Sequence, residues 1–252
     1  MNIPHPLPAL YWMWRQRSLD IHPWEDALAD MDVDGARIAI VGNAGYLSEQ
    51  SQGEHIDGHD VVLRMNNFRT TGFEHAVGSK IDVYMSNFYV PDIDFTNPDI
   101  QRARWIVSSR PNIFRKPKTY SLDLRYGEHL TDGLCRLGAQ CAYVPSLSYI
   151  RGLTGRLQNT PTTGTMAILF ATDVLLAKAA SLYITGFSFF EGNTHYFRNS
   201  NSDLQRFHNV TSEKTVLAEH LRAHLDAGRV TLDPTVAHHL GQQSTQPANL
   251  RQ

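Results

Sequence analysis

Cysteine is scarce in this sequence. The chain has only two, Cys135 and Cys141, and no second pair that could complete a tetrahedral zinc site. A single pair is also a poor disulfide framework for a secreted domain. We therefore expect two ordinary thiols and a protein that works in a reducing compartment.

Long apolar runs and an excess of charge of one sign are missing as well. No stretch reaches the roughly 20 apolar residues that span a bilayer, and residues 1–14 lack the basic and apolar regions of a signal peptide. The formal net charge of −2 argues against broad binding to nucleic acid. The expected location is the cytoplasm.

An aromatic segment lies near the N-terminus. Tyr11, Trp12 and Trp14 stand beside Arg15 and Arg17, a composition that suits the surface of a membrane. Such a cluster more often packs against its own domain or a partner. Peripheral contact with the inner face of the membrane is the alternative that this segment allows.

The composition suits one domain of ordinary size. Apolar residues make up 42% of the 252 residues, which is enough for a sizeable core. We expect an N-terminal extension over residues 1–35, a main domain over residues 36–240, and a disordered Gln/Ser/Pro-rich tail over residues 241–252.

Short apolar segments recur along the main domain. They predict strands at residues 38–41, 60–65, 80–85, 104–108, 141–144 and 181–185, and the apolar stretch 164–180 predicts a buried helix. This alternation indicates a single Rossmann-like α/β domain with a mostly parallel twisted sheet flanked by helices. Ligands of such sheets bind beyond the carboxyl ends of the strands. The loops after Val41, Met65 and Thr185 should therefore face one crevice.

The residues after the first predicted strand are Gly-Asn-Ala-Gly, at positions 42–45. Glycine there lets the backbone approach a phosphate or a ribose closely, although a plain strand-to-helix turn would use it too. The Gly-x-Gly-x-x-Gly fingerprint of a dinucleotide-binding oxidoreductase is not present in the sequence. An NAD-dependent enzyme is therefore disfavoured.

A longer series of motifs is more specific. Residues 41–47 (VGNAGYL), 56–66 (IDGHDVVLRMN), 71–74 (TGFE) and 77–80 (VGSK) resemble, in order, the large sialylmotif. Residues 161–164 (PTTG), followed by the apolar helix and by residues 183–187 (YITGF), resemble the small sialylmotif.

Two short motifs follow in the same order. His195, Tyr196 and Phe197 resemble the third sialylmotif, and His208 with Glu213 resembles the very small one. Chance could supply one short match but hardly all of them in sequence. The chain thus resembles the animal-type sialyltransferases, glycosyltransferase family 29.

The resemblance implies a fold and an activity. The fold would be the GT-A-like variant of the sialyltransferases. The activity would be the inverting, metal-independent transfer of sialic acid from CMP-sialic acid to a hydroxyl of a glycan acceptor. CMP-Kdo, whose eight-carbon sugar is also a carboxylated ketose, is the alternative donor. A non-catalytic nucleotide- or glycan-binding module of the same fold is the alternative from another class.

Two histidines are the expected catalytic residues. The ordinary pKa of histidine lies near neutrality, so His208 could accept the proton of the acceptor hydroxyl as its oxygen attacks the anomeric carbon. The histidine of the very small motif has this role in the family. By the same resemblance His195 stabilises the phosphate of the departing CMP.

The remaining site residues are assigned to the donor or to supporting positions. By resemblance Asn43 and Asn66 contact the phosphate and ribose, and Tyr196 shapes the pocket. The turn before the buried helix would lie against the carboxylate or the cytidine, where the helix dipole attracts an anion; it comprises Thr162, Thr163 and Gly164. Gly42 and Glu213 are expected to support this arrangement.

The sequence departs from the family at two cysteine positions. Golgi members join the large and small motifs by a disulfide, whereas Ile38 and about Ala179 stand at the matching positions here. The membrane anchor of those members is also missing. We therefore expect a cytoplasmic, bacterial-type enzyme whose acceptor is a cell-surface glycan, which includes glycans carried on a lipid.

Two patterns are compatible with a metal ion. The segments 30–32 and 92–94 both read Asp-x-Asp, the pattern of metal-dependent glycosyltransferases. His220 and His224 are four residues apart on a predicted helix, a spacing that suits zinc. The first pattern is common by chance and the second lacks a third ligand, so we expect neither a metal nor another cofactor.

Overall fold

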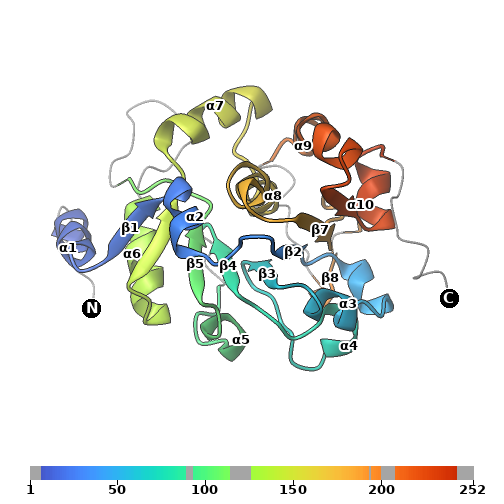
Figure 1. Cartoon of the computed structure of the whole chain (residues 1–252). Coiled ribbons are helices and arrows are strands. Elements are labelled where there is room, and N and C mark those ends of the chain that lie inside the picture. Colours follow the sequence, from blue (N-terminus) through green and yellow to red (C-terminus); the bar gives the residue numbers. More distant parts are fainter. Residues whose placement is uncertain (1–6, 89–92, 114–125, 193, 200–207, 243–252) are drawn as a thin grey trace.

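The computed structural model describes residues 7–88, 93–113, 126–192, 194–199 and 208–242 (Figure 1). Eight parallel strands form the main sheet, in the order β1-β6-β5-β4-β3-β2-β7-β10. These strands are β1 (Asp20–Pro23), β2 (Arg37–Val41), β3 (Val61–Met65), β4 (Val83–Ser86), β5 (Trp105–Ser108), β6 (Cys141–Val144), β7 (Ser181–Thr185) and β10 (Val230–Leu232). The predicted parallel α/β sheet is confirmed.

All six predicted strands are present, as β2 to β7, and the two edge strands were not predicted. The edge strand β1 pairs with β6 from Asp20 to Pro23. It lies within residues 1–35, so the sheet takes in part of the segment expected to be an extension. Residues 243–252 of the expected tail lie outside the described residues.

Helices cover both faces of the sheet because successive strand residues point to opposite sides. In β2, Ile38 and Ile40 belong to the core on one face, and Ala39 and Val41 to the core on the other. The first face is covered by α2 (Ala27–Asp30), α7 (Leu147–Leu157), α8 (Thr163–Asp173), α9 (Val210–Asp226) and α10 (Pro234–His239). The second is covered by α3 (Gly53–Asp57), α4 (Glu74–Val77), α5 (Pro98–Gln101) and α6 (Tyr126–Leu137) (Figure 1).

The predicted buried helix is α8. Apolar side chains surround it on nearly every side, and almost all of its residues are buried. A 3-10 turn, η3 (Leu175–Ala177), follows it. Ile38 and Ala179, which stand where the Golgi enzymes have a disulfide, are both buried in the same core. Apolar packing occupies these positions, and Cys135 and Cys141 are free thiols.

The N-terminal helix α1 (Leu7–Gln16) packs against α6. A guanidinium nitrogen of Arg15, Nη2, donates a hydrogen bond to Cys135 Sγ at 3.3 Å. Tyr11, Met13 and Trp14 remain exposed. Within the described ranges, no helix has the length and apolar character needed to cross a bilayer.

The direction of chain travel across the sheet reverses beside β2. Strands β3 to β6 follow on one side of it, and β7 and β10 lie on the other. Sheets of this kind bind ligands at such a switch point, outside the carboxyl ends of the strands. The loops after β2 and β7 therefore lie where the sequence predicted a crevice.

Gly42 offers a direct test of this geometry. A Cβ atom at Gly42 would lie 2.1 Å from the carbonyl oxygen of Gly186, whereas one at Gly152 in α7 would meet no atom within 4 Å. We expect Gly42→Ala to lower the free energy of unfolding by about 1–3 kcal/mol, because the two loops must separate. Gly152→Ala should raise it by about 0.5–1 kcal/mol, since alanine favours a helix interior. Urea unfolding of both variants makes the comparison, and equal stabilities would contradict it.

Candidate functional site

The loops that follow β2 and β7 are joined by main-chain hydrogen bonds. Gly42 N donates to Thr185 O at 2.8 Å, and Ala44 N donates to Gly186 O at 3.0 Å. Gly186 has a φ of +82°, which favours glycine. The tight contact between Gly42 and Gly186 holds the start of the Gly-Asn-Ala-Gly loop at the switch point.

A buried carboxylate fixes the same turn. Asp233 is fully buried, and its Oδ2 accepts hydrogen bonds from Thr185 Oγ1 and Tyr46 OH, both at 2.5 Å. Tyr46 OH in turn accepts one from Gly186 N at 2.7 Å. Burial, together with the charge of Asp233, raises the pKa of the Tyr46 phenol well above its usual value. Sequence reasoning missed both residues, although the Asp-Pro pair at 233–234 is a typical helix start.

Asn43 uses its amide nitrogen to connect two loops. Its Nδ2 donates to Met65 O at 3.0 Å and to Asn67 O at 2.9 Å, which ties the loop after β2 to the loop after β3. Its Oδ1 is buried and has no hydrogen-bond partner in the described part of the chain. A buried acceptor without a donor is costly, so this oxygen is suited to a ligand hydroxyl or N–H group.

Asn66 sits at the end of β3 in a strained conformation. Its φ is +50°, the left-handed region, where asparagine is tolerated better than most residues. Its backbone nitrogen donates to Met85 O at 2.9 Å, and its Oδ1 accepts from Ser86 Oγ at 3.4 Å. The loop after β3 is thereby joined to the end of β4.

A short hairpin, β8 (Thr194–His195) and β9 (Arg198–Asn199), lies against the loop after β2. His195 forms a β-bridge with Ala44, and Tyr196 N donates to Asn43 O at 3.2 Å. The Tyr196 hydroxyl donates to Arg69 O at 2.6 Å and accepts from Arg69 N. Burial raises the pKa of Tyr196 to about 12. The structure thus places His195 and Tyr196 directly beside Asn43.

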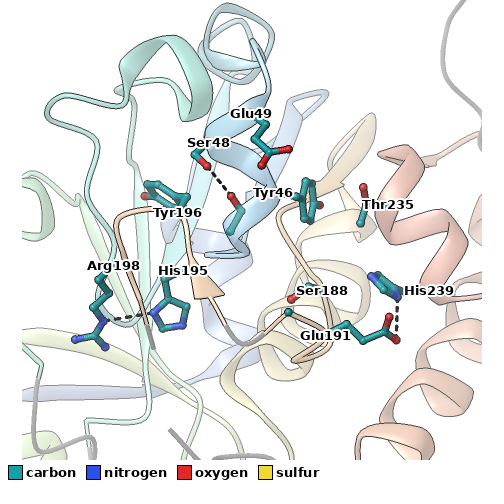
Figure 2. A pocket seen from close by; sticks show the side chains of 12 residues that line it. Tyr46, Ser48, Glu49, Ser188, Glu191, His195, Tyr196, Arg198, Thr235 and His239 are labelled. Carbon is teal, nitrogen blue, oxygen red and sulfur yellow. Dashed lines mark hydrogen bonds and ion pairs between the residues drawn. The ribbon is translucent and has the colours of Figure 1, made fainter. Parts of the chain in front are cut away.

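His195 lines a cavity of about 760 Å³ (Figure 2). His195 and Arg198 stand at one side of it, and His239 and Glu191 at the other, with His239 Nδ1 3.3 Å from Glu191 Oε1. Arg198 Nε makes a long contact of 3.5 Å with His195 Nδ1. Arg198 Nε can only donate, so this contact favours the neutral tautomer of His195 with its proton on Nε2.

A second group of predicted residues gathers at the start of α8. Thr162 is the N-cap, and its Oγ1 accepts from Thr165 N at 3.0 Å. The buried carboxylate of Glu213 accepts from Thr162 N at 3.1 Å and from Thr162 Oγ1 at 2.6 Å, and also from Thr165 Oγ1. Glu213 therefore fastens α9 to α8, and the Thr162 hydroxyl is fully engaged within the chain.

His208 lies next to this group. Its Nδ1 donates to Thr160 O at 2.8 Å and is 3.9 Å from Glu213 Oε1. The ring stacks on Phe190, with ring centroids 5.9 Å apart. Burial lowers the pKa of the His208 ring below its ordinary 6.5, against the opposing effects of the Thr160 carbonyl and Glu213. The neutral ring therefore has its proton on Nδ1 and its lone pair on Nε2.

The loop after β7 connects the two groups. The ring of Phe187 would lie 3.3 Å from a Cβ at Gly42 and 3.0 Å from one at Gly164. Phe190 further along stacks on His208, and Glu191 lines the cavity with His195. Glycine at positions 42 and 164 thus makes room for one aromatic ring between the loop after β2 and the start of α8.

The residues that could have held a metal have other partners. Asp94 accepts hydrogen bonds from Thr96 N and Oγ1 at 3.0 and 2.6 Å, and Asp92 lies outside the described residues. His220 Nε2 is 3.0 Å from Asp173 Oδ1, which joins α9 to α8.

A protein-family model matches part of the chain. Residues 24–100 match the model of glycosyltransferase family 29 (sialyltransferase). Over these residues the chain is similar to that family. The match covers β2, β3 and β4 with the loops after β2 and β3, which hold Gly42, Asn43 and Asn66.

Several proteins similar to this chain are named as sialyltransferases. The type 2 lactosamine alpha-2,3-sialyltransferase of Pan troglodytes is 26% identical over 215 residues, which are 75% of this chain and 63% of the relative. CMP-N-acetylneuraminate-beta-galactosamide-alpha-2,3-sialyltransferase 1 of Mus musculus is 37% identical over 83 residues, which are 29% of this chain and 24% of the relative. This chain thus spans less than two thirds of the length of these relatives.

A solved structure of a mammalian sialyltransferase in complex with Gal-beta-1-3GalNAc-ortho-nitrophenol is 18% identical to this chain. The two superpose with a TM-score of 0.47, over 92% of this chain and 86% of the other.

The protonation of His208 can be measured. We expect its ring pKa to lie below 6.5 in the folded protein, because burial penalises the charged form, and its neutral ring to carry the proton on Nδ1. More than half of the rings should then still be neutral at pH 6.5. Long-range ¹H–¹⁵N spectra across this range, assigned with His208→Gln, report both properties. A proton on Nε2 or a pKa above 6.5 would contradict the geometry.

Proposed function

We propose that this protein transfers sialic acid from CMP-sialic acid to a hydroxyl of a glycan acceptor, with inversion at the anomeric carbon. The observation that carries the proposal is the tautomer of His208. The Thr160 carbonyl accepts a hydrogen bond from Nδ1–H of His208, so Nε2 has the lone pair and lies next to the start of α8. The match of residues 24–100 to the family 29 model and the similarity to proteins named as sialyltransferases support the choice of reaction.

In the proposed reaction His208 is the general base. As the acceptor oxygen forms its bond to the anomeric carbon, its proton passes to His208 Nε2. The bond between that carbon and the phosphate oxygen breaks, and CMP leaves with the electron pair. A single displacement of this kind inverts the anomeric centre. The depressed pKa keeps His208 neutral, and therefore able to accept a proton, at neutral pH.

His195 acts on the leaving group. It lines the cavity and is bridged to Ala44 in the loop after β2, where a phosphate would lie. Its Nε2–H, the tautomer favoured by the contact from Arg198, can donate a hydrogen bond to the phosphate as negative charge develops.

The donor is held by groups at the ends of the strands. Asn43 has only an acceptor left, because its amide nitrogen is bound to Met65 O and Asn67 O. It therefore binds a ribose hydroxyl rather than a phosphate oxygen, which itself only accepts. Thr163 and Gly164 present N–H groups and the positive end of the α8 dipole to an anion. Asn66 and Tyr196 hold the neighbouring loops.

The proposed reaction uses no metal ion and no cofactor besides the CMP-sugar itself. Its acceptor is a cell-surface glycan, and glycans carried on a lipid are included. The enzyme acts on this acceptor in the cytoplasm, at the inner face of the membrane. The exposed Tyr11, Met13 and Trp14 of α1 would make the peripheral contact with that surface.

Donor choice and metal dependence are tested together. The purified protein should release CMP from CMP-sialic acid faster in the presence of a glycan acceptor than in its absence. Excess EDTA should leave that rate unchanged. Faster turnover of CMP-Kdo would move the proposal to the eight-carbon donor, and loss of the rate in EDTA would refute metal independence.

Replacement of His208 tests the base. We expect His208→Ala to lower kcat by about 100- to 10,000-fold with little change in the affinity for CMP, because the ring acts on the acceptor proton. His75→Ala is the matched control, since His75 is exposed and contacts Ser51 on the opposite face. Full activity of His208→Ala would rule out this residue as the base. Loss of CMP binding would show that it serves the donor instead.

A further inference from the structure

Arg110 is a buried cation that forms no ion pair with any carboxylate among the described residues. It stands two residues beyond β5, and 6% of its surface is exposed. Its backbone is held by Ser108, whose Oγ accepts from Arg110 N at 3.1 Å and donates to Arg110 O at 2.8 Å. Its guanidinium lies over the ring of Tyr126, 5.4 Å from the centroid. The side chain is therefore positioned from both ends.

The guanidinium is only partly satisfied. Nη2 donates to Pro161 O at 3.3 Å, whereas Nε and Nη1 are buried without a hydrogen-bond partner among the described residues. A buried charge in this state is costly, and burial lowers the pKa of Arg110. Ser109 Oγ and Asn112 Oδ1, in the same loop, are also buried and without a partner in the described ranges.

Arg64 shows what a structural arginine looks like in this fold. It is as deeply buried as Arg110, and it donates from Nε to Lys80 O at 2.8 Å and from Nη2 to Val77 O at 2.6 Å. Both of these nitrogens of Arg64 are satisfied by main-chain carbonyls. The unsatisfied hydrogen-bond donors of Arg110 are therefore a property of this position and not a general feature of buried arginines in this fold.

The neighbours of Arg110 belong to the candidate site. Pro161, which accepts its hydrogen bond, directly precedes the N-cap Thr162 of α8. The positive charge of Arg110 lowers the pKa of His208. The negative charge of Glu213 raises the pKa of Arg110, which opposes the effect of burial. Arg110, the start of α8 and His208 thus form one electrostatic unit.

We propose that Arg110 binds an anionic group of the CMP-sugar donor, either its phosphate or the carboxylate of its sugar. The inference rests on the proposed function. The ligand supplies the acceptor oxygens that Nε and Nη1 lack, and the N–H groups at the start of α8 bind the same anion from the other side. Because both nitrogens are covered in the free protein, the side chain has to shift slightly to meet the ligand.

The test compares binding with stability. Titration calorimetry of wild type and Arg110→Met is performed with CMP and with the unreactive donor CMP-3-fluoro-N-acetylneuraminic acid. We expect affinity to fall about 10- to 100-fold, the usual effect of losing charge-assisted hydrogen bonds. A loss for both ligands identifies the phosphate, and a loss for the sugar nucleotide alone identifies the carboxylate.

Thermal unfolding separates a binding role from a structural one. Removal of an unsatisfied charge should leave the Tm of the free Arg110→Met protein unchanged or higher, while the rise in Tm on adding ligand is lost. Arg110→Lys keeps the positive charge and serves as a second variant in case Arg110→Met misfolds. Its affinity for the ligand should lie between those of wild type and Arg110→Met. Arg104→Met is the control, because Arg104 is exposed and stacks only on Trp105.

The two proposals fail in different ways. If wild type binds neither ligand, the proposed function is wrong and this inference falls with it. If wild type binds and Arg110→Met binds equally well, the inference alone is overturned. A lower Tm of Arg110→Met with unchanged affinity would assign Arg110 a structural role only.

Discussion

The close contact of Gly42 with Gly186 is the constraint on which the site depends. The two residues follow neighbouring parallel strands at the point where the sheet reverses direction, and no side chain fits between them. Phe187 then fills the space between Gly42 and Gly164. As a result, the loop after β2, the loop after β7 and the start of α8 form one packed unit, to which the hairpin with His195 is attached.

Charge inside this unit is distributed unevenly. The carboxylates of Asp233 and Glu213 are buried, and hydroxyl and N–H donors satisfy them without a cation in hydrogen-bond contact. Arg110 is buried too, but it has no carboxylate within reach in the described residues. The two acids stabilise the fold, whereas the arginine retains capacity for an anion. This division would allow a site built on polar loops to be rigid and to bind the anion that we propose for Arg110.

Sequence reasoning was most reliable where apolar residues form a continuous run. The inner strands, such as Arg37–Val41, are buried on both faces, and α8 is apolar on nearly every side, so both were predictable. The edge strand Asp20–Pro23 was missed because it is short, none of its residues is fully buried, and Ile21 is its one aliphatic side chain. Asn43 and His208 were singled out through motifs. No pattern indicated the hydrogen bonds of Asp233 or Arg110, because their partners lie far away in the chain.

The sequence by itself determined the resemblance to glycosyltransferase family 29, the parallel α/β fold and the residues proposed for chemistry, because glycine, asparagine and histidine stand in a fixed order along it. Only the tertiary structure decided what each side chain is free to do. The amide nitrogen of Asn43 donates hydrogen bonds to two main-chain carbonyls, and His208 Nδ1–H donates one to the carbonyl of Thr160. These choices depend on hydrogen-bond partners 22 to 48 residues distant, which come into reach only when the strands pair.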